Sequence, residues 1–224
     1  MDTAVDFLIA LKKRFEARRN TEYAGKMKSY LRNQFEFIGL NAGTRREIQR
    51  ELLRDKGFPG KDDLLMIVRE LWTLPEREYQ HCAAEWMGRY IKKADRDIIR
   101  LIEYLISTKS WWDTVDYIAI NLAGTVFRKY PDLIIPVTSR WMDSGNIWLQ
   151  RSCILFQLKY KKDTDLELVY SFIDRLSGSK EFFIKKAIGW FLREYSKLDP
   201  MEVKRFVESR KLQPLSVREA MKYV

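Results

Sequence analysis

Residues 98–126 read IIRLIEYLISTKSWWDTVDYIAINLAGTV. Apolar side chains recur at the i, i+3, i+4, i+7 spacing in residues 98–105, and again in residues 115–126. This spacing places them on one face of an α-helix, whereas a half-buried strand would alternate apolar and polar residues. No segment of the chain alternates convincingly in that way. The stretch therefore predicts two amphipathic helices in succession.

The same helical period continues through most of the 224 residues. It corresponds to about thirteen helices, each of a typical length of ~11–12 residues. The chain has only 10 glycines and 6 prolines, which favours helices joined by short turns over a strand-rich fold. No Gly/Ser/Pro-rich linker divides the sequence, so we predict a single domain over residues 1–224.

Helix pairs recur at intervals of roughly 35–45 residues, which indicates an all-α, HEAT-like helical repeat solenoid. In a solenoid, one layer of helices lines a concave surface, and we expect the functional residues on that surface. The repeats agree in pattern rather than in letters, so a compact orthogonal helical domain is the alternative.

Residue types typical of helix ends occur between the apolar patterns. Thr44 and Glu47 form a capping-box sequence, which predicts a helix start, and Gly57 is the expected end of that helix. The other expected N-caps are Asp62, Asp95 and Asn146, and the expected first-turn prolines are Pro75 and Pro200.

The chain is basic, with 41 Lys and Arg against 31 Asp and Glu and a formal net charge of +10. Such a surplus favours polyanions, and DNA, RNA and acidic membranes all qualify. A soluble basic protein without such a partner is the plain alternative. No apolar run reaches ~18 residues, and the first residues lack a signal-peptide pattern. We therefore expect a cytoplasmic protein that does not bind a membrane.

Cysteine and histidine are too scarce for several kinds of chemistry. Cys82 and Cys153 cannot make a disulfide framework, and their apolar helical surroundings are typical of reduced core thiols. His81, the single histidine, adjoins Cys82, but successive helical side chains point ~100° apart and chelate poorly. We predict neither a metal nor a cofactor. The Walker A, G-x-G-x-x-G, G-x-S-x-G and H-E-x-x-H signatures are also absent.

Three segments place an aromatic residue beside a charged one at helical spacing. Trp112 and Asp116 are four residues apart and lie on one side of a helix. Arg151 is expected within the first two turns of its helix, where free backbone N–H groups and a guanidinium together suit an anion. The third segment forms a stripe of Lys186, Trp190 and Arg193.

Core packing is the competing explanation for the aromatic residues, because tryptophans on helices are most often buried. On spacing alone, Trp112 and Trp190 would be core residues too, and Asp116 would be a solvated or capping carboxylate. The tryptophans that we assign to packing are Trp72, Trp86, Trp111, Trp141 and Trp148.

Residues 109–116, KSWWDTVD, closely resemble the AlkD-like family of bacterial DNA glycosylases. Further similar blocks lie at residues 69–72, 74–78, 146–151, 154–160, 179–184, 186–190, 192–195, 214–216 and 218–220. The blocks extend almost end to end. The resemblance implies a HEAT-like-repeat fold with a basic concave cleft for double-stranded DNA. We expect a monomer, because DNA enzymes of this size usually need no partner.

The resemblance also implies excision of N3- and N7-alkylated purines without flipping the base into a pocket. By its motifs, Asp116 is the catalytic carboxylate, Trp112 and Trp190 flank the deoxyribose of the lesion, and Arg151 contacts a nearby phosphate. Further implied DNA contacts are Tyr30, Arg46, Lys159, Lys186 and Arg193. The family often has a proline near residue 43, where this chain has NAGT at residues 41–44, so the helix cap before Arg46 differs.

A cationic alkylpurine leaves the sugar as a neutral base, so its release needs no general acid. One carboxylate that stabilises the oxocarbenium-like sugar can suffice. A related branch of the family lacks the catalytic residues and is inactive, but this chain has them all, so we expect activity. The alternatives are a catalytically inactive HEAT-like protein that binds or senses damaged DNA, and a scaffold whose basic groove holds acidic peptides.

Overall fold

The computed structural model describes residues 3–224, which form fourteen α-helices and no β-strand. The predicted all-α helical repeat fold is confirmed, with one helix more than the sequence indicates. Contacts divide the chain into two compact units, Met1–Tyr90 and Ile91–Val224, and we describe each unit by itself. The single domain and the concave DNA-binding surface stay predictions.

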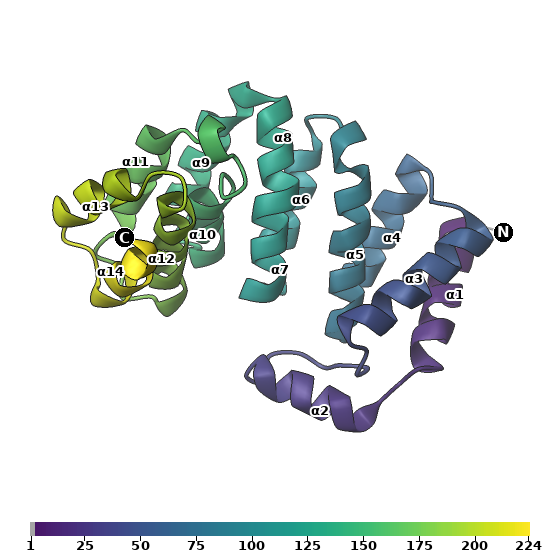
Figure 1. Cartoon of the computed structure of the whole chain (residues 1–224). Helices are drawn as coiled ribbons and strands as arrows, with labels where there is room; N and C mark the ends of the chain where they lie inside the picture. The colour runs from purple at the N-terminus through teal and green to yellow at the C-terminus, as the bar shows by residue number, and fades with distance from the viewer. Residues whose placement is uncertain (1–2) are drawn as a thin grey trace. The chain divides into compact units, whose positions relative to one another are not determined.

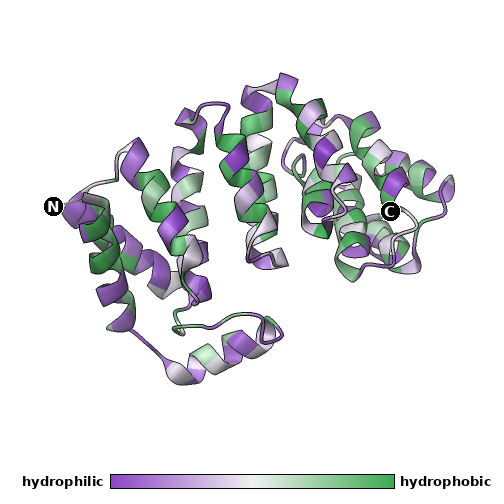
Figure 2. Ribbon diagram, turned by 180° about the vertical axis from the view of Figure 1, so that it is seen from behind, coloured by the Kyte–Doolittle hydropathy of each residue, from purple (hydrophilic) through white to green (hydrophobic). Residues whose placement is uncertain are grey.

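The first unit consists of α1 (Thr3–Glu16), α2 (Thr21–Tyr30), α3 (Ala42–Lys56), α4 (Lys61–Thr73) and α5 (Arg77–Tyr90) (Figure 1). α4 packs against α5, and α1 packs against α3 and α4. Trp72 and Trp86 lie in this core with exposed fractions of 1% and 0%, as predicted. In contrast, α2 has no buried residue and is mostly hydrophilic (Figure 2).

A buried carboxylate holds the segment that joins α2 to α3. Glu78 of α5 is fully buried and accepts hydrogen bonds from the backbone N–H groups of Ile38, Gly39 and Leu40 at 3.1, 2.8 and 3.1 Å. Gly39 has a φ of +95°, and a Cβ there would lie 1.9 Å from the carbonyl oxygen of Asn20. Only glycine fits this approach. The close contact between this segment and the start of α2 therefore depends on Gly39.

The second unit contains the remaining helices (Figure 1). Its α-helices are α6 (Ile98–Ser107), α7 (Trp112–Tyr117), α8 (Gly124–Lys129), α9 (Ile134–Asp143), α10 (Ile147–Leu155), α11 (Leu166–Leu176), α12 (Phe182–Ser196), α13 (Pro200–Glu208) and α14 (Pro214–Ala220). Its short helical turns are η1 (Ile91–Lys93), η2 (Ile118–Ala123), η3 (Pro131–Leu133), η4 (Lys161–Asp163) and η5 (Met221–Tyr223). α12 packs against α10, α13 and α14.

The predicted amphipathic helix around residues 115–126 is confirmed, and it is longer than the pattern. α7, η2 and α8 follow one another without a break over residues 112–129. The middle part, η2, is a π-helix. Its apolar residues Ile118, Ala119 and Leu122 are fully buried, which the sequence pattern predicts, but the wider turn itself has no periodic signature.

Three predicted helix boundaries are confirmed. Gly57 ends α3 with a φ of +77°, and Pro200 is the first residue of α13. The side chain of Asn146 accepts hydrogen bonds from the backbone N–H groups of Trp148 and Leu149 at the start of α10. These residues satisfy or end the backbone hydrogen-bonding pattern as their types predict.

Four boundary predictions are wrong. α3 begins at Ala42 rather than at Thr44, because Asn41 caps it by accepting the backbone N–H of Thr44 at 2.9 Å. Pro75 precedes the first turn of α5, which begins at Arg77, and the N–H of this first residue donates to the carbonyl of Glu36 at 2.9 Å. Asp62 lies within the first turn of α4, and Asp95 lies two residues before Asp97, the N-cap of α6.

Losing the Asn146 cap should destabilise the helix that carries Arg151. We expect Asn146→Ala to lower the free energy of unfolding by about 1 kcal/mol, because two backbone N–H groups of α10 lose their acceptor. Asn146→Ser keeps a capping oxygen and serves as the control. Equal stability of the Ala and Ser variants in urea unfolding would contradict the role of the cap.

Other sequence expectations concern cysteines, membranes and metals. Cys82 and Cys153 are both buried and unpaired, as predicted. Within residues 3–224, no helix is both long and apolar enough to cross a bilayer. In the same residues, no three His, Cys, Asp or Glu side chains gather in a way that could hold a metal ion.

Candidate active site

Asp116 lies in α7, one turn after Trp112, the first residue of that helix. Its Oδ1 accepts a hydrogen bond from Nε of Arg151 at 2.7 Å, and its Oδ2 accepts one from Nη2 at 2.9 Å. A planar guanidinium and a carboxylate match in this two-point geometry. The side chains of Asp116 and Arg151 are 15% and 5% exposed. The pair is largely shielded from water, while the carboxylate keeps some contact with solvent.

Arg151 connects three helices of the second unit. It comes from α10, binds Asp116 of α7, and donates from Nη1 to the backbone carbonyl of Phe183 in the first turn of α12. All three guanidinium nitrogens are therefore engaged. The sequence predicts an anion-binding site at Arg151. In this structure the anion that Arg151 binds is the carboxylate of Asp116. Its contact with a DNA phosphate stays a prediction.

An aromatic cluster supports the carbonyl that anchors Arg151. The ring of Phe183 packs against Trp148 and Trp111 with centroid distances of 4.9 and 5.0 Å, and the two indoles are 5.7 Å apart. Such tilted and edge-to-face contacts stabilise a fixed arrangement of rings. Trp111 and Trp148 thus have the packing role that the sequence predicts, although both are half-buried rather than fully buried.

Burial and neighbouring charges shift the pKa of the Asp116 carboxyl group in opposite directions. Burial raises the pKa of the carboxyl group above its ordinary value, because the charged form loses water. The hydrogen bonds and the positive charge of Arg151 oppose this rise, while the nearby Asp113 adds to it. The net shift is upward. Arg151 is therefore the main group that favours the charged form of this carboxyl.

The π-helix η2 begins two residues after Asp116. Single π turns inside α-helices occur frequently at functional sites, where they change the direction of side chains. Asn121 of η2 accepts a hydrogen bond from Nζ of Lys159 at 2.8 Å. Lys159, a predicted DNA contact, is thereby tied to the same helical run as Asp116, with its side chain exposed.

The third predicted segment lies on α12. Trp190 is half-buried there, one turn after Lys186 and one turn before Arg193. Lys186 and Arg193 both bind the carboxylate of Glu219, at 3.2 and 2.5 Å. The structure therefore brings these two predicted DNA contacts together through an acidic residue that the sequence analysis did not single out.

Tyr30 and Arg46 belong to the first unit. Tyr30 is the last residue of α2 and is 72% exposed. Arg46 is also exposed and binds Oε1 of Glu85 through Nε at 2.9 Å. Glu85 additionally binds the buried Arg45 and Gln49. Both predicted DNA contacts are thus on the surface of this unit, and Arg46 has a fixed acidic partner.

Comparison with known proteins decides which family these residues belong to. A sequence profile described as "DNA alkylation repair enzyme" matches residues 11–224. The chain belongs to this family.

A solved structure supports the same assignment. The chain is similar to a "Predicted DNA alkylation repair enzyme from Enterococcus faecalis", with a TM-score of 0.85 and 30% sequence identity. The similarity covers 92% of this chain and 96% of that chain. A search among curated proteins found no match. Membership of the DNA alkylation repair enzyme family gives the chain a role in the repair of alkylated DNA.

Three residues of this repair enzyme that were not predicted from the sequence hold the predicted ones in place. Phe183 offers the carbonyl for Arg151, Asn121 binds Lys159, and Glu219 binds Lys186 and Arg193. Phe183 and Glu219 fall in blocks that carry the family resemblance, which was the available signal. Asn121 has no such signal, because its contact depends on the π-helix and on a residue 38 positions away.

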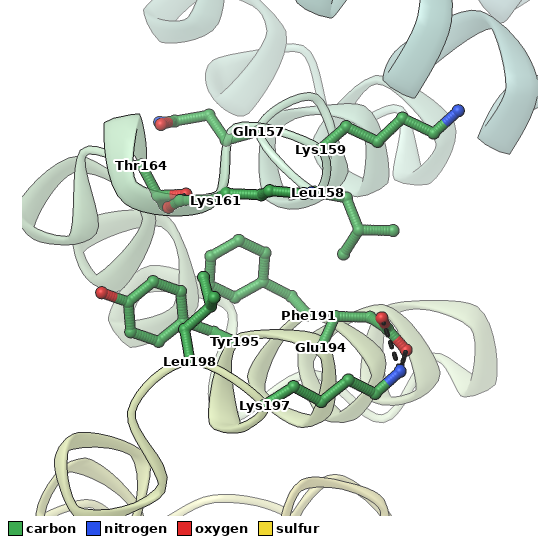
Figure 3. A pocket seen from close by; sticks show the side chains of 10 residues that line it. All are labelled: Gln157, Leu158, Lys159, Lys161, Thr164, Phe191, Glu194, Tyr195, Lys197 and Leu198. Atoms are coloured by element: carbon green, nitrogen blue, oxygen red, sulfur yellow. Dashed lines mark hydrogen bonds and ion pairs between the residues drawn. The ribbon is translucent and has the colours of Figure 1, made fainter.

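A pocket of about 270 Å³ in the repair enzyme lies between residues 157–164 and the C-terminal half of α12 (Figure 3). Phe191, Tyr195 and Leu198 supply apolar side chains, and Lys197 binds Glu194 at its edge at 2.8 Å. Lys159 lines this pocket, whereas Trp112, Asp116, Arg151 and Trp190 do not. The candidate active site is a partly exposed ion pair.

Proposed function

We propose that the chain is a monofunctional DNA glycosylase. It hydrolyses the N-glycosidic bond of cationic N3- and N7-alkylated purines in double-stranded DNA. The observation that carries this proposal is the Asp116 carboxylate, held at two points by Arg151 and still partly exposed. The family membership, with its role in alkylation repair, supports the same kind of substrate.

The reaction suits a site with one carboxylate. Alkylation gives the base a positive charge, so the bond between C1′ and the base nitrogen breaks with both electrons passing to the base. The base leaves neutral, and the sugar becomes an oxocarbenium-like cation. Water then attacks C1′ and releases one proton to solvent. The enzyme needs only to stabilise the cationic sugar and orient the water.

Asp116 can do this without leaving Arg151. A carboxylate has about four lone-pair sites, and Arg151 uses one on each oxygen. The remaining lone pairs can accept a hydrogen bond from water and face a cationic sugar. Because Arg151 is itself fixed by Phe183, the carboxylate is oriented before the substrate binds. Such preorganised charge avoids reorganisation during the reaction.

The remaining predicted residues have supporting roles in this proposal. Trp112 and Trp190 present indole faces beside the sugar, and no enclosing pocket for a flipped base is required. We propose that the enzyme acts as a monomer and that phosphates of the duplex are contacted by Tyr30, Arg46, Arg151, Lys159, Lys186 and Arg193.

The decisive experiment is incubation with methylated duplex DNA, followed by chromatography of the released bases. We expect free 3-methyladenine or 7-methylguanine, with unmodified bases retained. Binding of the methylated duplex without any released base would overturn the glycosylase proposal and leave a non-catalytic DNA-binding protein.

The indole of Trp112 should contribute to the rate. We expect Trp112→Leu to slow excision roughly 2- to 30-fold, because an aromatic face stabilises an adjacent cation by ~0.5–2 kcal/mol. Trp112→Phe keeps an aromatic face and is the matched control. If the Leu and Phe variants excise equally fast in single-turnover assays, Trp112 has no role in stabilising the sugar.

A further inference from the structure

Glu219 of α14 is 5% exposed, yet its carboxylate binds three cationic side chains. Nη1 of Arg193 lies 2.5 Å from Oε2, Nζ of Lys222 lies 3.1 Å from the same oxygen, and Nζ of Lys186 lies 3.2 Å from Oε1. We call these four residues the Glu219 cluster. Its centre is negative and buried, while its cationic side chains reach toward solvent.

The position of Glu219 is set by close packing between α12 and α14. A Cβ on Gly189 would lie 2.5 Å from the Cβ of Glu219 and 2.9 Å from the carbonyl oxygen of Ser216. Ser216 also donates its hydroxyl to the carbonyl of Lys185 at 2.9 Å. The two helices therefore touch at the glycine, and Glu219 is held beside the surface of α12.

Charge in the Glu219 cluster is not balanced. Three cations share one carboxylate, which leaves two net positive charges in a small region. Although burial raises the pKa of Glu219, the hydrogen bonds and positive charges of Lys222 and Lys186 together outweigh burial and hold the pKa below its ordinary value. One of these cations would be enough to join α14 to α12 through Glu219. The other two leave a net positive charge that can bind an external anion.

The exposure of the cations shows that such an anion can reach them. The side chains of Lys186 and Lys222 are 38% and 46% exposed, and that of Arg193 is 22% exposed. Trp190, which we place beside the sugar of the lesion, lies between Lys186 and Arg193 on α12. A backbone phosphate near the lesion would therefore be adjacent to the cluster.

We propose that Lys186, Arg193 and Lys222 form one binding site for a DNA backbone phosphate, assembled on the Glu219 carboxylate. This makes Lys222, in the turn η5, a DNA contact. The inference rests on the proposed function in taking duplex DNA as the ligand and in placing Trp190 beside the sugar of the lesion, and it does not depend on base release. Lysine and arginine that contact phosphates release condensed cations from DNA, which makes the affinity depend on salt.

The test measures the affinity of Lys222→Met for an undamaged duplex over a range of salt concentrations. We expect the slope of log K against log salt to be smaller than in the unsubstituted protein by up to about 0.9, the change for complete loss of one phosphate contact, because Lys186 and Arg193 remain at the site. Lys204→Met is the matched control. Lys204 in α13 is similarly exposed, at 47%, and also lies near a glutamate of its own segment.

The control should keep the original slope, because Lys204 lies outside the cluster. Equal slopes for the two variants would overturn the inference, since each removes one positive charge. The outcome is independent of catalysis. A reduced slope for Lys222→Met with no release of methylated bases would support the phosphate site and reject the glycosylase, whereas base release with equal slopes would do the reverse.

Discussion

Asp116→Asn should lower the rate of 7-methylguanine release by at least about 10²-fold, because a preorganised electrostatic group of this kind contributes ~2.7–4 kcal/mol. The amide keeps the shape of the side chain but removes the negative charge that faces the sugar. Affinity for undamaged duplex should not fall, since Asp116 is not proposed to contact phosphate. Single-turnover release measured at saturating enzyme separates the chemical step from binding.

The neighbouring Asp113→Asn is the matched control for this variant. Asp113 lies in the first turn of the same helix and raises the pKa of Asp116 by repulsion. Its loss removes the same charge without removing the carboxylate that binds Arg151. We expect excision to be retained at neutral pH. If both variants lose activity alike, or if Asp116→Asn remains active, the catalytic role of Asp116 is refuted.

Arg151→Met should have the second large effect, on stability and on excision together. Removing one partner of a buried ion pair costs about 3–5 kcal/mol, because the other charge stays buried without compensation. The Phe183 carbonyl loses its donor as well. We expect a loss of this size in the free energy of unfolding at neutral pH, measured by urea denaturation.

A second substitution tests whether the uncompensated charge is the cause. Adding Asp116→Asn to Arg151→Met removes the carboxylate that has lost its partner. The double variant should therefore be more stable than Arg151→Met alone, because the two effects are coupled. Additive losses in the double variant would show that the ion pair does not account for the destabilisation.

The same variant should change the pH dependence of excision. Asp116 is active in its charged form, and without Arg151 the remaining influence on its pKa is chiefly burial, which raises it. The acidic limb of the rate profile should therefore move to higher pH in Arg151→Met, and raising the pH should recover part of the lost rate. An acidic limb that stays in place would mean that Arg151 does not control this carboxyl group.

The pattern of apolar residues was sufficient to predict most of the fold. Helical period, the scarcity of glycine and proline, and three of the proposed helix boundaries all agree with the structure. These features depend on neighbours within a few residues, which the sequence displays directly. The predicted helix start at Thr44 is wrong because Asn41, three residues earlier, supplies an equally good cap. The predicted position of Pro75 in a first turn is wrong because α5 begins two residues later, at Arg77, whose N–H donates to the carbonyl of Glu36.

By itself, the sequence determined the helical fold, the excess of positive charge and the residues on which a site could be built. Only the tertiary structure decided how those residues are partnered. Arg151 and Asp116 are 35 residues apart in the sequence, and Arg193 and Glu219 are 26 apart. Helical periodicity carries no information over such separations. Their charges pair because packing brings the helices together and burial makes an unpaired charge expensive.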